Sequence, residues 1–156
     1  MLNRAQAVWV CRRSVSALLV VCLGLGCLGC QPSGRSGVTM TDAKDRLSKL
    51  FQLYKVYVEK HQKGPPDEKA LREFGKKLSE KDLSDYMIGK DLESIFTSPR
   101  DKQPFAIRYS DSLDSGGEPR AIAWEVTGEG GKRYVALSMG YVEEYDEDTF
   151  KQYQKK

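Results

Sequence analysis

Cysteine and histidine are scarce in this sequence, which limits the chemistry that the chain can support. Its 156 residues include one histidine, His61, and four cysteines, all of them within the first 30 residues. The rest of the chain has no thiol, which excludes a disulfide framework and a cysteine nucleophile there. One histidine without cysteine does not supply the usual zinc ligands either. We therefore predict no metal and no cofactor, and a domain stabilised by its apolar core alone.

An excess of charge of one sign is also missing outside the amino-terminal segment. The chain has 25 lysines and arginines against 22 aspartates and glutamates. Arg4, Arg12 and Arg13 lie in the first 30 residues, where there is no acid, so the remainder carries 22 charges of each sign. Binding to nucleic acid or to an anionic lipid surface depends on a basic excess. No nucleic-acid partner is therefore predicted.

The amino-terminal segment combines the features of an export signal. Three arginines precede residues 14–26 (SVSALLVVCLGLG), an apolar run shorter than the roughly 20 residues that span a membrane. The segment Leu25–Gln31 (LGCLGCQ) resembles the lipobox of bacterial lipoproteins, in which a cysteine after a small residue is lipidated and becomes the new amino terminus. A glycine precedes both Cys27 and Cys30, and the residues before Cys30 fit the pattern better.

This resemblance implies three parts of the chain. Residues 1–29 form the signal peptide, residues 30–40 a flexible tether, and residues 41–156 a single domain. Cys30 carries the lipid, with Cys27 as the alternative, and the exported protein is anchored to the inner or outer membrane of a bacterial cell envelope. An uncleaved hydrophobic anchor and an ordinary signal peptide cut elsewhere remain as alternatives.

Helical periodicity dominates the first half of the domain. Apolar residues recur on one helical face over residues 41–62, and the Gly-Pro-Pro sequence at 64–66 ends that helix. The predicted buried stripe of this amphipathic helix consists of Leu47, Leu50, Phe51, Tyr54, Tyr57 and Val58. A shorter helix is predicted over residues 67–78, and a short helix or a turn within residues 82–96.

After these helices the hydrophobic pattern changes to a period of two. Strands are predicted over residues 105–109, 121–126, 134–137 and 141–144. A glycine-rich hairpin turn is predicted at 128–132, and three acids at 146–148 begin a closing helix with Phe150 and Tyr153 on its buried side. This order predicts an α+β fold, in which the long helix packs on one face of a small antiparallel sheet of about four strands.

Two stretches resemble the major pseudopilins of type II secretion and related type IV pilin-like proteins. Thr97–Phe105 is similar to their Asp-x-x-Gly-x-Pro-Tyr turn before the first strand. Lys132–Glu143 followed by Asp148–Phe150 is similar to their carboxyl-terminal ending. The resemblance implies a pilin-like fold and an envelope location. Met139 replaces the aspartate of their Asp-Gly turn, and their apolar helix and peptidase site are missing, so assembly into a pilus is not expected.

Three local motifs invite a more specific function, and each has a simpler structural explanation. Gly128–Lys132 lacks the Ser or Thr and the helix that follow a phosphate-binding loop, so no nucleotide site is predicted. His61 falls at the end of the long helix, where basic side chains suit the helix dipole, and no partner for a catalytic base is indicated. Asp111, Asp114 and Glu118 share one loop but match no calcium pattern, which leaves calcium binding there open.

The aromatic residues leave a binding function open. Those on the predicted amphipathic elements, most of them expected in the core, are Tyr54, Tyr57, Tyr109, Trp124, Tyr134 and Tyr141. No catalytic residue is assigned, although the carboxylate pair of a hydrolase can come from distant positions. We expect a lipid-anchored envelope protein that acts as a structural or protein-interaction module with protein partners in the envelope. The alternative is a small periplasmic module that binds a glycan or a peptide on an aromatic sheet face.

Overall fold

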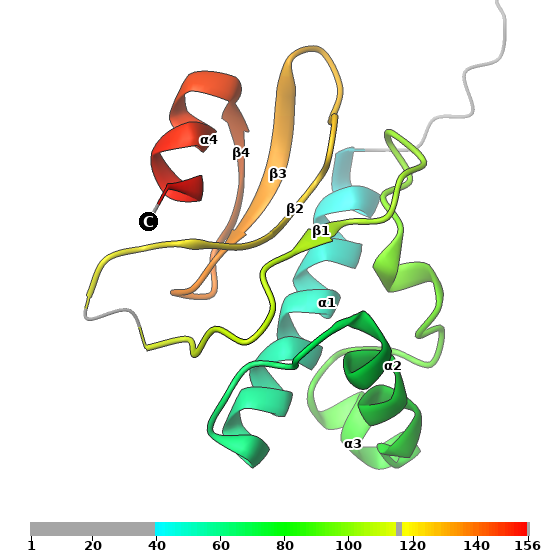
Figure 1. The fold of residues 1–156 in the computed structure, drawn as a ribbon. Helices are drawn as coiled ribbons and strands as arrows, with labels where there is room; N and C mark the ends of the chain where they lie inside the picture. Colours follow the sequence, from blue (N-terminus) through cyan, green and yellow to red (C-terminus); the bar gives the residue numbers. More distant parts are fainter. Residues whose placement is uncertain (1–39, 115–116, 156) are drawn as a thin grey trace, which may run out of the picture. The chain divides into compact units, whose positions relative to one another are not determined.

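The computed structural model describes residues 40–114 and 117–155. The predicted signal peptide, both lipidation candidates and all of the predicted tether except Met40 lie outside the described residues. In chain order the elements are α1 (Met40–His61), α2 (Glu68–Lys77), α3 (Glu80–Asp85), the 3₁₀ helix η1 (Ser94–Phe96), β1 (Ala106–Ile107), β2 (Ala121–Trp124), β3 (Lys132–Leu137), β4 (Val142–Asp146) and α4 (Glu147–Gln154) (Figure 1). The predicted α+β fold is confirmed.

The sheet is antiparallel, with the strand order β1-β2-β3-β4. Side chains alternate between its two faces along β3. Tyr134 and Ala136 belong to the core cluster that contains the buried side chains of α1. Val135 and Leu137 belong to a second cluster, which contains Phe150 of α4. Helices α1 and α4 therefore pack on opposite faces of the sheet (Figure 1).

Helix α1 is buried over a wider surface than one stripe. The residues of the predicted stripe that are buried are Leu47, Leu50, Phe51 and Tyr54. Tyr57 and Val58 are half-buried, whereas Leu53 and Val56, which lie off that stripe, are 0% and 1% exposed. The prediction of a single buried stripe was too narrow because α2 and η1 also contact α1, in addition to the sheet.

Several predicted segments differ in extent from the observed elements. The strands predicted over residues 121–126, 134–137 and 141–144 are observed over residues 121–124, 132–137 and 142–146. The strand predicted over residues 105–109 shortens to Ala106–Ile107, because only these two residues pair with β2 as a ladder. The segment 82–96 contributes to two elements, α3 and η1, and α3 begins before it at Glu80. Ser79 fixes this earlier start: its hydroxyl accepts a hydrogen bond from the Asp82 N–H at 3.1 Å, and the Asp82 carboxylate accepts one from the Ser79 N–H at 3.1 Å.

Candidate functional site

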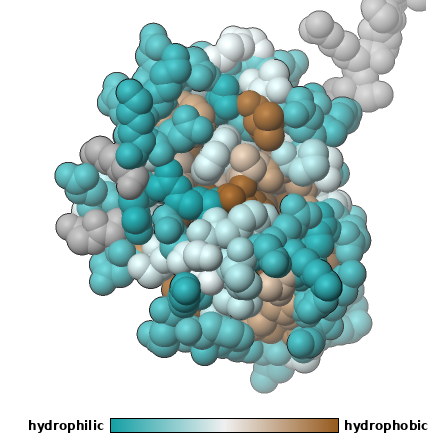
Figure 2. All heavy atoms as spheres, in the orientation of Figure 1, coloured by the Kyte–Doolittle hydropathy of each residue, from teal (hydrophilic) through white to brown (hydrophobic). Residues whose placement is uncertain are grey.

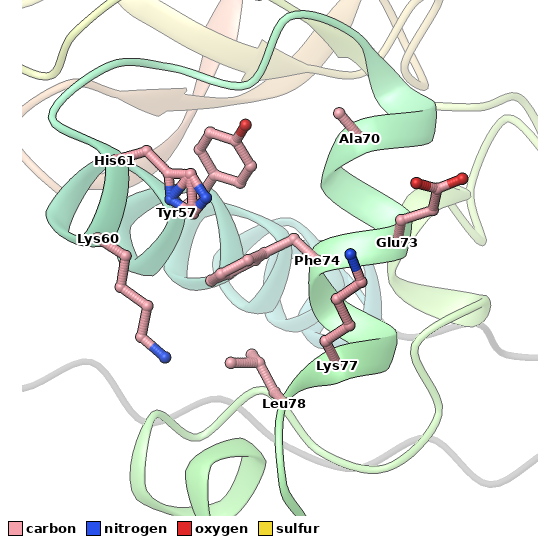
Figure 3. A pocket seen from close by; sticks show the side chains of 8 residues that line it. All are labelled: Tyr57, Lys60, His61, Ala70, Glu73, Phe74, Lys77 and Leu78. Atoms are coloured by element: carbon pink, nitrogen blue, oxygen red, sulfur yellow. The ribbon is translucent and has the colours of Figure 1, made fainter.

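A pocket of about 370 Å³ lies between the last turn of α1 and one side of α2 (Figure 3). Aromatic and charged side chains line it: Tyr57, Lys60, His61, Ala70, Glu73, Phe74, Lys77 and Leu78. Its volume falls within the range that is usual for small-ligand sites. This α1–α2 pocket is the candidate functional site.

The turn between α1 and α2 determines where the pocket forms. The Gly-Pro-Pro sequence at 64–66 follows α1, and Asp67 caps α2 by accepting a hydrogen bond from the Ala70 N–H at 2.7 Å. Gly64 lies so close to a neighbouring loop that a Cβ atom there would be 2.2 Å from the carbonyl oxygen of Asp111. This tight turn returns the chain along α1 and places the side chains of α2 opposite those of the last turn of α1.

Three rings from the two helices form an aromatic cluster in the pocket. Tyr57 and His61 are stacked, with ring centroids 4.3 Å apart and an interplanar angle of 23°. Phe74 meets both rings edge-on, at 5.1 Å from Tyr57 and 5.6 Å from His61. His61 is exposed, and the other two rings are half-buried. The cluster therefore presents an apolar surface that is partly open to solvent.

His61 occupies the predicted place at the end of α1, and its surroundings do not resemble those of a catalytic base. In the part of the chain that the structure describes, its contacts are with the rings of Tyr57 and Phe74, and no carboxylate or hydroxyl is hydrogen-bonded to its imidazole. A Ser-His-Asp arrangement requires both partners. His61 is therefore a lining residue of the pocket.

Basic side chains border the aromatic cluster. The ammonium group of Lys60 lies 5.6 Å from the centroid of the Phe74 ring, and Lys77 extends from α2, so that the two lysines border the pocket from different helices (Figure 3). Neither lysine forms an ion pair with a carboxylate within the described ranges. Glu73, the acid among the lining residues, lies 4.0 Å from Lys69. The pocket consequently has a local excess of positive charge.

A second hollow lies beside the first and shares two of its residues. It has a volume of about 310 Å³ and is lined by Tyr57, His61, Lys63, Gly64, Pro66 and Ser110. The stacked pair of Tyr57 and His61 thus lines both hollows. Lys63 adds a further ammonium group to the surface around the stack.

The glycine-rich segment predicted as a hairpin turn over residues 128–132 does connect β2 and β3, although Lys132, its last residue, already belongs to β3. The N–H groups of Gly128 and of Thr127 before it each donate a hydrogen bond to the Asp101 carboxylate at 3.0 Å, so they are not available to a phosphate. Partial burial acts to raise the pKa of Asp101, but the N–H groups of Gly128, Thr127 and Gln103 outweigh it and lower that pKa below its usual value. Asp101 therefore fastens the loop before β1 to this turn.

The three acids of the loop before β2 do not gather into a metal site. Asp111 lies 3.8 Å from Arg108 and 3.7 Å from Arg120, so its carboxylate is paired with arginines. Over residues 40–114 and 117–155, no group of three His, Cys, Asp or Glu side chains is placed to hold a metal ion. The structure does not bring Asp111, Asp114 and Glu118 together as ligands.

A buried ionic network, which sequence analysis missed, joins the loop before β1 to the sheet. Glu125 is 0% exposed and accepts hydrogen bonds from the Ser98 hydroxyl at 2.6 Å and from the Tyr134 N–H at 2.9 Å. The Arg100 guanidinium lies 3.5 Å from Glu125 and 2.9 Å from Glu144. It also lies over the Tyr134 ring, 4.7 Å from its centroid. With the side chains of Arg100 and Glu125 both buried, this network has a structural role.

The aromatic residues considered for a binding face are dispersed. Tyr54 and Tyr134 are buried, and Tyr141 is exposed. Tyr57, Tyr109 and Trp124 are half-buried. Trp124 packs on Phe150 of α4, with ring centroids 5.6 Å apart. On the face shown in Figure 2, hydrophobic side chains form small, separate patches. Of the six aromatic residues, Tyr57 is the one that lines the α1–α2 pocket.

Comparison with known proteins adds no further assignment. No protein family, curated protein or solved structure was found to match this chain. Among the described helices, none has both the length and the apolar character that a membrane span requires. The lipoprotein and pilin-like resemblances therefore stay predictions, and a functional proposal rests on the sequence and on the geometry of the domain.

Proposed function

We propose that this chain is a lipid-anchored protein of a bacterial cell envelope, and that its α+β domain acts as a structural or protein-interaction module. The observation that carries the proposal is the sequence of the amino-terminal segment. A basic start and a short apolar run lead to Leu25–Gln31, in which Cys30 follows a glycine and precedes a polar stretch. No catalytic role is assigned to the domain.

The surface of the domain supports an interaction role. Helices pack on both faces of the sheet, whereas the α1–α2 pocket is bordered by exposed basic side chains around an aromatic cluster. Aromatic side chains, tyrosine among them, are frequent anchors in protein interfaces, and charged side chains around them add electrostatic complementarity to a partner. A lipid on Cys30 would confine such a pocket to the membrane surface and raise its effective concentration toward other membrane-bound proteins.

The pilin-like character is part of the same proposal. It is supported by the order of the elements, in which a long first helix and three short helical segments are followed by an antiparallel sheet and a short closing helix. It is also supported by the places of the two similar stretches: Thr97–Phe105 directly precedes β1, and Lys132–Glu143 covers β3 and the turn into β4. The role envisaged is that of an anchored single domain and not of a pilus subunit.

The test is mass spectrometry of the amino-terminal peptide from the full-length chain, expressed in a bacterium with a lipoprotein pathway. We expect loss of residues 1–29 and a diacylglyceryl group on Cys30. Cys30→Ser should abolish the modification, and the matched variant Cys27→Ser should leave it in place. An intact Met1, or a processed terminus without lipid in the unmutated chain, would overturn the anchor and with it the proposed location.

A further inference from the structure

We propose that the α1–α2 pocket binds an acidic segment of a partner protein, in which a carboxylate stands next to an aromatic or large apolar side chain. The inference rests on the proposed interaction function and names the chemistry of the partner. It depends on three properties of the pocket: its charge, its aromatic cluster and its continuity with the second hollow.

The charge of the pocket selects an anionic occupant. Lys60 comes from the last turn of α1 and Lys77 is the last residue of α2, so each helix contributes one ammonium group to the border of the pocket. Neither ammonium group is neutralised by an ion pair within the described residues, and Glu73 is the single acid in the lining. A carboxylate of the occupant can form a charge-assisted hydrogen bond with either ammonium group, and such bonds are stronger than neutral ones. A cationic or neutral segment would leave these charges unpaired.

The aromatic cluster selects a neighbouring apolar group. Phe74 is packed edge-on against the stacked pair of Tyr57 and His61, and Leu78 completes the apolar part of the lining. The packing of the rings against one another holds them in place before a ligand arrives, which lowers the entropic cost of binding. With about 370 Å³ available, the pocket has room for one large side chain and an adjacent carboxylate.

The second hollow favours a polypeptide over a small free ligand. Tyr57 and His61 line both hollows, so an extended segment can cross the stacked pair and place residues on either side of it. Lys63 lies in the second hollow and offers another contact for an acidic residue. An anionic membrane is a less suitable occupant, because the chain after residue 30 carries 22 charges of each sign and has no basic excess.

The experiment is a titration of the isotope-labelled full-length protein, in nonionic detergent, with the peptide acetyl-Gly-Glu-Phe-Glu-Gly-amide, followed by NMR. We expect saturable shifts of the Tyr57, His61 and Phe74 signals with a Kd tighter than about 1 mM. Lys60→Glu and Lys77→Glu should each weaken binding about tenfold or more. Lys44→Glu is the matched control on α1, since it makes the same charge change at an exposed position outside the pocket lining. It should leave the Kd within about twofold.

Several outcomes would overturn the inference. One is that the pocket signals do not shift at up to about 5 mM peptide. Another is that a peptide with Gln in place of Glu binds as tightly as the acidic peptide, or that Lys44→Glu weakens binding as much as Lys60→Glu and Lys77→Glu do. The last is that the protein binds anionic vesicles more strongly than the peptide. The lysine variants change exposed side chains, and circular dichroism checks that they fold. A lipidated Cys30 together with a pocket that ignores the peptide would reject this inference alone. An unmodified Cys30 would reject the anchor alone.

Discussion

At the scale of single residues, Asp101 shows how one carboxylate connects two parts of the chain. It lies in the loop before β1, and its Oδ2 atom accepts hydrogen bonds from Thr127 and Gly128 next to the β2–β3 turn, both at 3.0 Å. Its Oδ1 atom accepts a third from the Gln103 N–H at 3.1 Å. All three donors favour the ionised form, in agreement with the lowered pKa of this carboxyl.

Replacing Asp101 by asparagine should destabilise the domain in a pH-dependent way. The amide has one acceptor oxygen and turns its NH₂ group toward N–H donors, so we expect a loss of about 1–3 kcal/mol in the free energy of unfolding at pH 7. The pKa of Asp101 in the folded protein is lowered from 3.8. The contribution of its charge is therefore complete well above pH 3.8 and declines as the pH falls through the folded-state pKa.

Urea unfolding of the full-length protein, measured from pH 7 down to about pH 3, tests this expectation. The difference between the unmutated chain and Asp101→Asn should shrink as the pH falls. Asp85→Asn is the matched control, because Asp85 is an exposed aspartate at the end of α3. It should change the stability by less than about 0.5 kcal/mol throughout. A difference for Asp101→Asn that is the same at pH 7 and pH 3 would contradict the role of the ionised carboxylate.

Single residues of the candidate site could be recognised in the sequence, but the site itself could not. Tyr57 and His61 stood out as a stripe residue and as the lone histidine at the end of a helix. Their stacking follows from the four-residue helical spacing, whereas their contact with Phe74 depends on how α2 packs. Likewise Glu125 is an acid at the end of an apolar strand, and nothing in the sequence shows that Arg100 lies beside it.

At the scale of elements, hydrophobic periodicity correctly predicted the type and position of an element wherever that element packs against one neighbouring layer. It predicted α1, α2, the hairpin turn and α4 to within a few residues. It failed where a second neighbour matters: Leu53 and Val56 are buried although they lie off the predicted stripe, because α1 also contacts α2 and η1. The length of β1 was overestimated because residues with strand-like alternation form a ladder only where a partner strand pairs with them.

The β2–β3 hairpin depends on Gly128 for two separate reasons. Its φ of +69° is a conformation that disfavours side chains, and a Cβ atom there would lie 2.0 Å from the carbonyl oxygen of Lys132. Gly130 provides a matched comparison, because its φ is +62° but a Cβ atom would meet nothing within 4 Å. The two positions therefore differ in steric contact and share the backbone conformation.

We expect Gly130→Ala to lower the free energy of unfolding by about 1–2 kcal/mol, the cost of a left-handed conformation. Gly128→Ala should cost about 1–3 kcal/mol more, because the added methyl group forces the hairpin backbone apart. Urea unfolding followed by circular dichroism measures both values. Equal losses for the two variants would show that backbone conformation alone decides the stability of this turn.

At the scale of the whole molecule, the fold class could be predicted because the order of the elements restricts how their apolar faces are buried. Helices followed by an antiparallel sheet and a closing helix allow few compact arrangements. The placement of α4 on the face opposite α1 also follows from alternation along β3. Val135 and Leu137 point to that face, and α4 removes their apolar side chains from water. Function is not restricted in this way, because a site is a local arrangement that many folds can carry.

The membrane anchor and the α1–α2 pocket should work independently of each other. The α1–α2 pocket is lined by residues between Tyr57 and Leu78, whereas the predicted signal peptide and Cys30 belong to a separate part of the sequence. Replacing residues 1–30 by a cleavable export signal without a lipobox should therefore release the protein from the membrane fraction. Its unfolding temperature should stay the same, and its Kd for the acidic peptide should stay the same within about twofold.

The reciprocal change is the double variant Lys60→Glu/Lys77→Glu in the full-length chain. It should stay in the membrane fraction and lose peptide binding, because both substitutions are at exposed positions of the domain and leave residues 1–30 unchanged. If the chain with the exchanged signal lost peptide binding as well, the amino-terminal segment would have to contribute to the pocket. The two functions would then be coupled through the lipidated Cys30, because the exchange leaves the predicted tether after it in place.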